Sequence, residues 1–273
     1  MPRFAANVSF MFTELPFLDR FQAAAKAGFE AVEFHYPFDY DPRDVRARLE
    51  HYRLAPVLIN IRAGLAILGE WGFAGVPGRE ESFRLCVAEA IEYAIVIGVP
   101  QLNCLAGVEA RGVGASVCES TLISNLRHAA SECALANLAV NLEPINTRDV
   151  PGYLVDNTRD AIRVMDAVGA ANLKLQLDCY HMQIMEGGGA EALAATIERL
   201  HSRIGHIQFA DVPGRHEPGT GAIDYQQVFA KIDRMGRAGK YSGWVSAEYW
   251  PSAGRSTEET LGWFQNWRNE NNE

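Results

Sequence analysis

The stretch Ala139–Asn146, AVNLEPIN, holds the pattern from which the fold of this chain can be worked out. A short, nearly apolar run is closed by Glu143 and Pro144. Runs of this kind are typical of strands in a parallel sheet that is buried on both faces. A carboxylate at the end of a buried strand is costly unless another group pairs with it. The stretch therefore predicts a buried strand that ends in a paired carboxylate.

The same unit recurs along the chain as a short β-branched run, a polar or glycine-rich loop and a helical stripe. Eight strands are predicted in this way: Phe4–Ser9, Ala31–Phe34, Ala55–Asn60, Gln101–Cys104, Ala139–Glu143, Leu173–Asp178, Ile204–Phe209 and Gly243–Glu248. Helical stripes lie between them and end at glycines such as Gly28, Gly98 and Gly169, which are suited to left-handed caps. Eight units in 273 residues average about 34 residues each, the size of a βα repeat.

We therefore predict an α/β protein that folds as a single (β/α)8 TIM barrel, with residues 1–273 in one domain. The alternative, an open doubly wound sheet, usually carries a GxGxxG turn after an early strand, and the sequence has none. No low-complexity linker divides the chain.

Composition narrows the classes of function. An apolar fraction of 48% predicts a globular protein rather than a disordered one, and no 18-residue apolar window predicts a membrane span. The N-terminal segment contains Asn7, Ser9, Thr13 and Glu14 and lacks a small-residue cleavage site, so we expect no signal peptide. A net charge of −9 argues against a nucleic-acid partner. Five scattered cysteines without CxxC spacing favour a reduced, cytoplasmic protein.

Polar residues close the carboxyl ends of the predicted strands, where TIM barrels carry their active sites. Four of them stand at consecutive strands, five to eight: Glu143, Asp178, Gln208 and Glu248. Three carboxylates so close together resist joint ionisation, and a bound divalent cation removes that conflict. Carboxylate and amide oxygens suit Mg²⁺ or Mn²⁺ better than zinc. The pattern predicts a metal site, although each residue alone is equally explained as a satisfied polar group at a strand end.

A cation flanked by two glutamates indicates proton-transfer chemistry. A 2-hydroxy carbonyl compound or 2-oxo acid can chelate the cation, which acidifies the adjacent C–H bond. Glu143 and Glu248 then lie on opposite sides of the substrate, where one removes a proton from carbon and the other acts at the neighbouring position. The intermediate is an enediolate whose developing charge the metal stabilises.

Two further residues are candidates for substrate binding. His181 lies three residues after Asp178 and is placed to bind a substrate hydroxyl or carboxylate, with a structural loop histidine as the alternative. Arg215 is placed to pair with a substrate carboxylate, with a surface salt bridge to Glu217 as the alternative. Arg62 is a weaker candidate for the same role.

Other strand-end residues receive no chemistry. We favour a structural role for His35 and Asn60, and Glu33 is left out of the site because its direction is undetermined. The glycine-rich loop 61–79 is predicted to act as a mobile lid, since Trp71 and Phe73 are expected to cover the site.

Four segments together resemble a known family: NLEPIN around Glu143, LQLDCYHMQIMEG around Asp178, HIQFADVPGRHEPGTGAIDY around Gln208, and WVSAEYWP around Glu248. They are similar to hydroxypyruvate isomerases of the xylose-isomerase-like TIM barrel superfamily, including the related 2-oxo-tetronate isomerases. The similarity extends over the whole chain, with AVEFHYPFDY and PGREESFR as further matching segments.

The resemblance implies an intramolecular oxidoreductase of the aldose–ketose type, acting on a small hydroxy-oxo acid. For hydroxypyruvate the product is 2-hydroxy-3-oxopropanoate, tartronate semialdehyde. Carried over motif by motif, Glu143 and Glu248 become the proton donor and acceptor. Together with Asp178 and Gln208 they also become the ligands of Mg²⁺ or Mn²⁺.

Alternatives stay open at this point. A 2-oxo-tetronate isomerase fits the same motifs, and the loop after strand three departs from the family pattern, which leaves the acid undetermined. Ketose 3-epimerases usually have histidine where Gln208 stands. A DNA-repair endonuclease needs several histidines and a basic groove, and a non-catalytic binding barrel does not need two intact glutamates. Barrels of this kind often pair, so a homo-oligomer is conceivable.

Overall fold

The computed structural model describes residues 2–65 and 69–271. Within them, eight parallel strands close into a barrel in sequence order. The strands are β1 (Arg3–Asn7), β2 (Ala31–Phe34), β3 (Ala55–Asn60), β4 (Gln101–Cys104), β5 (Ala139–Leu142), β6 (Leu173–Asp178), β7 (Ile204–Phe209) and β8 (Trp244–Ala247). Each of them overlaps a strand predicted from the sequence, so the predicted barrel is confirmed. A single domain over residues 1–273 stays a prediction.

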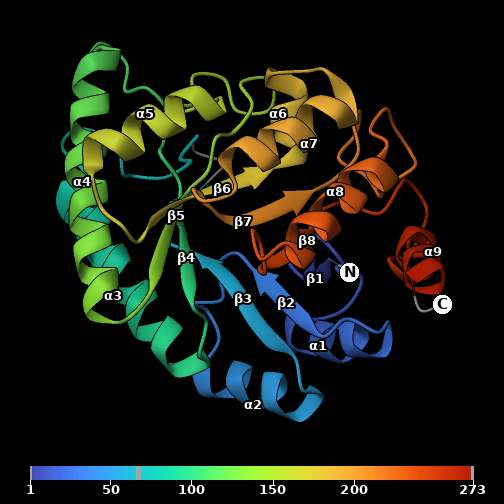
Figure 1. The fold of residues 1–273 in the computed structure, drawn as a ribbon. Coiled ribbons are helices and arrows are strands. Elements are labelled where there is room, and N and C mark those ends of the chain that lie inside the picture. Colours follow the sequence, from blue (N-terminus) through green and yellow to red (C-terminus); the bar gives the residue numbers. More distant parts are fainter. Residues whose placement is uncertain (1, 66–68, 272–273) are drawn as a thin grey trace.

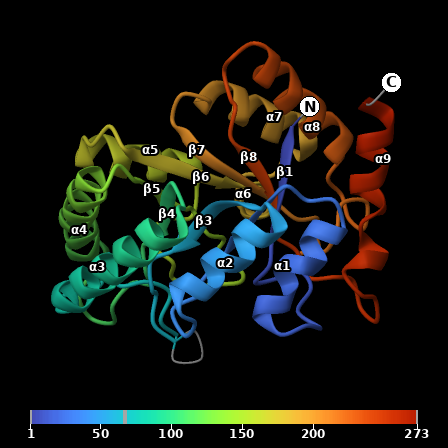
Figure 2. The same ribbon diagram turned by 90° about the horizontal axis from the view of Figure 1, so that it is seen from below.

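Helices surround the strands on the outside of the barrel (Figure 1). They are α1 (Phe17–Lys26), α2 (Pro42–Tyr52), α3 (Glu80–Ile97), α4 (Ala115–Leu135), α5 (Thr158–Val168), α6 (Cys179–Met185), α7 (Gly189–Leu200), α8 (Tyr225–Arg237) and α9 (Gly262–Asn271), with a 3-10 turn at Glu258–Thr260. Figure 2 shows α1, α2 and α3 side by side along one side of the barrel. Among the helices of the described ranges, none has the length and apolar character needed to cross a membrane.

Helix ends follow the local sequence signals. The side chains of Asn157 and Asp224 accept hydrogen bonds from backbone N–H groups in the first turns of α5 and α8. Gly98 and Gly169 end α3 and α5 in the left-handed conformation that the sequence predicts for them. The caps at Asn157 and Asp224 mark where the long connections after β5 and β7 end and the next helices begin.

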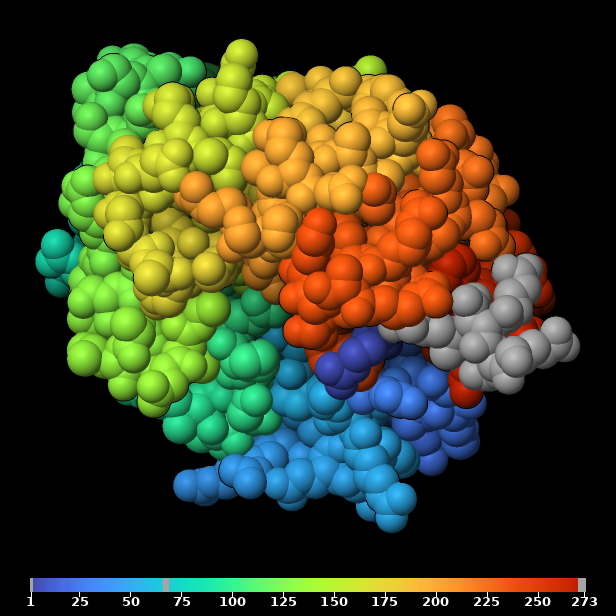
Figure 3. Space-filling view, viewed as in Figure 1, coloured from blue at the N-terminus to red at the C-terminus, as the bar shows by residue number. Residues whose placement is uncertain are grey.

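Barrel closure joins the two ends of the chain. Strand β1 pairs with β8 from Arg3 opposite Trp244 to Ala6 opposite Ala247. In Figure 3 the blue N-terminal atoms adjoin orange-red atoms of the C-terminal part. Helix α9 strengthens this closure because Phe4 makes edge-on ring contacts with Trp263 and Phe264 at 5.3 and 5.9 Å.

The two faces of the strands have different surroundings. Outward side chains such as Phe209 pack on helices in a large apolar core. Inward side chains are largely polar, and hydrogen bonds between side chains of different strands cross the barrel interior. An interior filled with amides and carboxylates is unusual for this fold, where branched apolar residues normally dominate. The polar interior lies directly beneath the candidate site.

Candidate active site

The four strand-end residues predicted as a group lie together at the carboxyl ends of β5 to β8. Asp178 and Gln208 are opposite one another in the β6–β7 pair, and Glu143 and Glu248 directly follow β5 and β8. None of the four is more than 4% exposed. The carboxamide nitrogen of Gln208 donates to Glu248. The sequence thus predicted which side chains meet, and their roles in catalysis stay predictions.

Burial makes the three carboxylates electrostatically demanding. Burial raises the pKa of Glu143 well above its usual range, and the neighbouring charges of Glu248 and Asp178 raise it further. The pKa of Asp178 is raised to about 7, chiefly by burial and then by Glu248, although Arg215 opposes the shift. The guanidinium alone therefore does not compensate the negative charge that three ionised carboxylates would bring into this site.

Arg215 reaches the site from the loop after β7. Its guanidinium donates to Asp178 Oδ2 at 3.2 Å and also to Glu248. The alternative salt bridge with Glu217 is not formed, because Glu217 accepts hydrogen bonds from Arg255 at 2.9 Å and from Ser252. The backbone of Arg215 is left-handed, with φ of 57°, so the loop holds this residue in an uncommon conformation.

His181 faces the carboxylates with Nε2, which lies 3.8 Å from Glu143 Oε1 and 3.5 Å from Asp178 Oδ2. Its Nδ1 lies 2.7 Å from the carboxamide nitrogen of Asn146. The orientation of that carboxamide is fixed, because Asn146 also donates to Asp149 Oδ2 and accepts from the backbone N–H of Asp149. Nδ1 is therefore an acceptor, and the ring proton resides on Nε2. Burial lowers the pKa of His181 well below its usual value, which keeps the ring neutral.

A buried group in the site could hold a metal ion. Glu143, Asp178 and His181 each present one ligand atom, and these atoms lie within 4.8 Å of one another. The donor set and the excess of buried negative charge fit a divalent cation. The hydrogen bond from Asn146 argues against His181 as a ligand, since Nε2 would first have to lose its proton.

A cavity of about 520 Å³ opens above these residues. Glu143, Glu248, His181 and Arg215 line it, together with the aromatic side chains of Phe10, Tyr36, Trp71 and Trp250. His35 and Asn60 also line it, and His35 Nε2 lies 3.4 Å from Glu248 Oε2, so both belong to the cavity wall. The structural role predicted for these two residues stays a prediction.

Arg62 lies outside this cavity wall. It forms a two-pronged ion pair with Glu89, both contacts at 2.9 Å, and its guanidinium stacks over Phe38. The charge of Arg62 is therefore paired with Glu89 on α3. Among the described residues that line the cavity, the arginine is Arg215.

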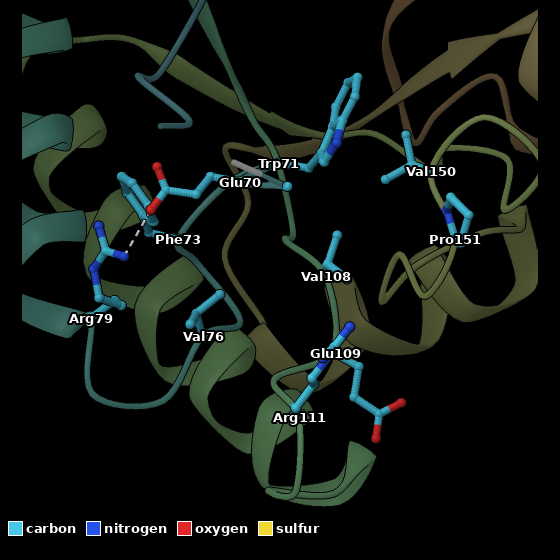
Figure 4. Close-up of a pocket in the computed structure, with 12 residues that line it drawn as sticks. Glu70, Trp71, Phe73, Val76, Arg79, Val108, Glu109, Arg111, Val150 and Pro151 are labelled. Carbon is cyan, nitrogen blue, oxygen red and sulfur yellow. Dashed lines mark hydrogen bonds and ion pairs between the residues drawn. The ribbon is translucent and has the colours of Figure 1, made fainter. Parts of the chain in front are cut away.

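Residues between 69 and 79 of this loop line a neighbouring cavity of about 490 Å³ (Figure 4). Glu70, Trp71 and Val150 line both cavities. Figure 4 shows the ion pair between Glu70 and Arg79, whose charged atoms lie 3.0 Å apart. Trp71 lines the candidate site, whereas Phe73 is buried and lines only the neighbouring cavity. The action of the loop as a lid stays a prediction.

Two glycines of this loop fix its position. A Cβ at Gly72 would overlap the carbonyl oxygen of Leu105, and one at Gly75 would lie 2.8 Å from that of Ala106. The Gly75 N–H donates to Ala106 at 2.7 Å. These glycines allow the loop to pack closely on the segment after β4. Residues 66–68, part of the predicted lid, lie outside the described residues.

Sequence analysis gave no role to several residues that support the site. Asn103 donates to Glu143 Oε2 at 2.7 Å, and Asn146 orients His181. Glu33 and His206 lie fully buried inside the barrel beneath the site. The signal for Asn103, Glu33 and His206 was their place on the inward face of a strand, but the sequence alone did not establish the strand register.

The protein is a closed (β/α)8 barrel with a cluster of buried carboxylates at the carboxyl ends of its strands. A profile described as "Xylose isomerase-like TIM barrel" matches residues 21–267. The chain belongs to this family, as the sequence predicted.

Named relatives are similar over nearly the whole chain. The 2-oxo-tetronate isomerase of Cupriavidus necator is 44% identical over 97% of this chain and 98% of its own length. The hydroxypyruvate isomerase of Escherichia coli is 43% identical over 98% of this chain and 100% of its own length. These relatives confirm the prediction of an isomerase.

The solved structures include a similar barrel, the crystal structure of "AP endonuclease, family 2 from Brucella melitensis", which superimposes with a TM-score of 0.91. It is 40% identical and covers 98% of this chain and 99% of that one.

Proposed function

We propose that this protein interconverts hydroxypyruvate and 2-hydroxy-3-oxopropanoate, with Glu143 and Glu248 as the proton donor and acceptor. The observation that carries the proposal is the position of two buried carboxylates, from strands three apart around the barrel, on the wall of one cavity. Two such groups can act on neighbouring carbons of one small substrate.

The reaction needs only proton movements. One glutamate takes a proton from C3 of hydroxypyruvate, and the other delivers a proton to C2. The C3 hydroxyl loses its proton to become the aldehyde oxygen, while the C2 oxo oxygen gains one to become a hydroxyl. The intermediate is an enediolate.

Arg215 and His181 orient the substrate in this proposal. The guanidinium of Arg215 is the cation on the cavity wall and suits the substrate carboxylate. The Nε2–H of His181 points toward Glu143 and Asp178, where it donates to a substrate oxygen. Both assignments agree with the substrate-binding roles predicted from the sequence.

Mg²⁺ or Mn²⁺ would complete the proposed site, with the carboxylates of Glu143, Asp178 and Glu248 as its ligands. When bound, the cation would supply Lewis-acid polarisation of the substrate carbonyl. Gln208, the fourth ligand predicted from the sequence, turns its nitrogen toward Glu33 and Glu248, and its oxygen accepts from Gln176 at 2.6 Å. A half-turn that presented the oxygen to a cation would break these hydrogen bonds, so the orientation found here favours Gln208 as a support of Glu248.

Isomerisation of a four-carbon 2-oxo-tetronate is the second candidate. The relative from Cupriavidus necator carries that name, and a cavity of about 520 Å³ has room for either acid. The similar protein from Brucella melitensis is instead called an endonuclease. The group in this chain that could hold a metal contains one histidine and two carboxylates, which favours the isomerase.

Two parts of the proposal rest on the sequence. A cytoplasmic location rests on the scattered cysteines, all five of which are unpaired here. Assembly into a homo-oligomer is proposed because barrels of this kind often pair.

The test combines isotope exchange with two variants. In D₂O the unaltered protein should introduce deuterium at C3 of recovered hydroxypyruvate, and a panel of three- and four-carbon acids, with and without metal, identifies the preferred substrate. Glu143→Gln and Glu248→Gln should each lower kcat at least about 100-fold while the circular dichroism spectrum is unchanged. Near-normal turnover by either variant would exclude the two-glutamate scheme.

A further inference from the structure

A second carboxylate lies beneath Glu248, inside the barrel. Glu33 on β2 and His206 on β7 are both 0% exposed, and His206 Nε2 lies 2.5 Å from Glu33 Oε2. The other oxygen of Glu33, Oε1, accepts hydrogen bonds from side-chain amides. Glu33 is thus held by partners on both of its oxygens, out of contact with solvent.

Two carboxamide groups connect this carboxylate to Glu248. The nitrogen of Asn7 lies 2.9 Å from Glu33 Oε1 and 2.8 Å from Glu248 Oε2. The nitrogen of Gln208 lies 2.7 Å from the same Glu33 oxygen and also donates to the same Glu248 oxygen. One oxygen of each glutamate is therefore shared by the same two donors.

The arrangement leaves the two oxygens of Glu248 in different surroundings. Oε2 is bound by Asn7 and Gln208 and has His35 Nε2 at 3.4 Å, whereas Oε1 is bound by Arg215 at the cavity. Glu143 has a separate support, since Asn103 on β4 donates to it. The connection through Glu33 therefore reaches only one of the two glutamates by direct hydrogen bonds.

Stability alone does not explain a buried carboxylate in this place. Replacing buried charged groups with apolar residues of similar volume is often neutral or stabilising, because burial of charge is costly. Barrel interiors are normally packed with branched apolar side chains, which would fill the same space. The geometry at Glu248 offers an explanation that packing does not.

We propose that Glu33, held by His206, is a positioning residue that orients Glu248 through Asn7 and Gln208. Its carboxylate fixes the two carboxamides, and these fix Oε2 of Glu248, so that Oε1 is presented to the substrate. The hydrogen-bond acceptor is what matters here, since Glu33 itself does not reach the cavity. This role rests on the proposed proton-transfer function of Glu248.

The test compares two substitutions of Glu33 at saturating metal. Glu33→Met has a similar shape but no acceptor, and we expect kcat to fall at least about 30-fold, with the substrate KM and the metal Kd within about threefold. Glu33→Gln keeps an acceptor oxygen and should retain kcat within about fivefold. Because Glu143 is not disturbed, the ratio of deuterium exchange at C3 to that at C2 should shift at least about tenfold in Glu33→Met.

Two further variants keep the result interpretable. If Glu33→Met does not fold, Asn7→Ala removes one of the two connections and should shift the exchange ratio in the same direction. Asn141→Ala is the matched control, because Asn141 is fully buried in the same interior but donates to Gln101 at 3.0 Å. We expect its exchange ratio to equal that of the unaltered protein.

The positioning role would be overturned by a kcat of Glu33→Met within about threefold of normal, by a Gln variant no better than the Met variant, or by an equal loss of exchange at both carbons. A loss of activity that tracks a weakened metal Kd would also do so. Failure of the unaltered protein to exchange at either carbon would instead refute the proposed function.

Discussion

The raised pKa of Asp178 predicts that the metal-free protein loses stability as the pH rises. A carboxyl group whose folded-state pKa is raised stabilises the fold fully below its unfolded pKa, and this contribution is lost as the pH rises through the folded value. Asp178 has a folded pKa of about 7, because it is buried beside Glu248, and Arg215 and the backbone N–H of Tyr180 oppose the shift only in part. The loss should therefore occur between about pH 4 and pH 7.

The magnitude follows from the two pKa values. An unfolded pKa of about 3.9 and a folded one of about 7 differ by about 3 units, or about 4 kcal/mol in full. Between pH 5 and pH 8 the folded group releases its proton while the unfolded group is already ionised. The expected loss over this interval is about 3 kcal/mol, equivalent to about 5 °C in Tm for a chain of this size.

Urea unfolding of metal-free protein at pH 5 and pH 8 measures the effect, with Asp178→Asn as the control because its amide does not titrate. His181, whose pKa is lowered, acts in the opposite direction and is present in both proteins. Glu143, whose pKa the charge of Asp178 helps to raise, acts in the same direction as Asp178 and adds to the difference between the two proteins. Relative to the Asn variant, the unaltered protein should lose about 3 kcal/mol at the higher pH. Parallel pH profiles for the two proteins would refute the reasoning.

Two substitutions away from the carboxylates test the supporting structure. Gly72 has a φ of 107°, and a Cβ there would overlap the carbonyl of Leu105. Gly72→Ala should therefore destabilise the fold by about 2 kcal/mol or more and raise KM. Gly78→Ala, at a position with open space around it, should cost about 1 kcal/mol of stability and leave KM unchanged. Equal KM values would show that the loop does not shape the cavity. Phe4→Ala removes the ring on which α9 packs and should lower the free energy of unfolding by about 3–5 kcal/mol. Leu135→Ala, at a position 79% exposed, is the control and should change the free energy of unfolding by less than about 0.5 kcal/mol. Similar losses for both would contradict the role of α9 in closing the barrel.

The barrel was predictable because its signals are local. A strand buried on both faces has a nearly continuous apolar sequence, and Gly98 or Asn157 marks a helix end through contacts within a few residues. The same rule located Glu143 and Glu248, since TIM barrels place their sites at the carboxyl ends of strands. The position of a residue along the chain was sufficient in these cases.

Contacts between distant strands were not predictable in the same way. Glu33 was left out because a shift of one residue in the register of β2 would turn its side chain outward. The link from His206 to Glu33 spans 173 positions in the sequence, and only the closed barrel brings them together. The pairing of Arg62 with Glu89 was missed for the same reason, because it depends on how α3 lies against the loop after β3.

The charges at the mouth of the barrel destabilise the protein when no cation or substrate is bound. Three buried carboxylates face one guanidinium, and the raised pKa values of Glu143 and Asp178 measure the resulting conflict. A divalent cation and a chelating acid relieve that conflict, since they bring positive charge and oxygen atoms to the same place. Ionisation of these carboxylates without a partner destabilises the folded state. A ligand that binds only the folded state and pairs with them therefore restores stability to the fold. Folding of the site and binding of its cation are therefore linked through the same side chains.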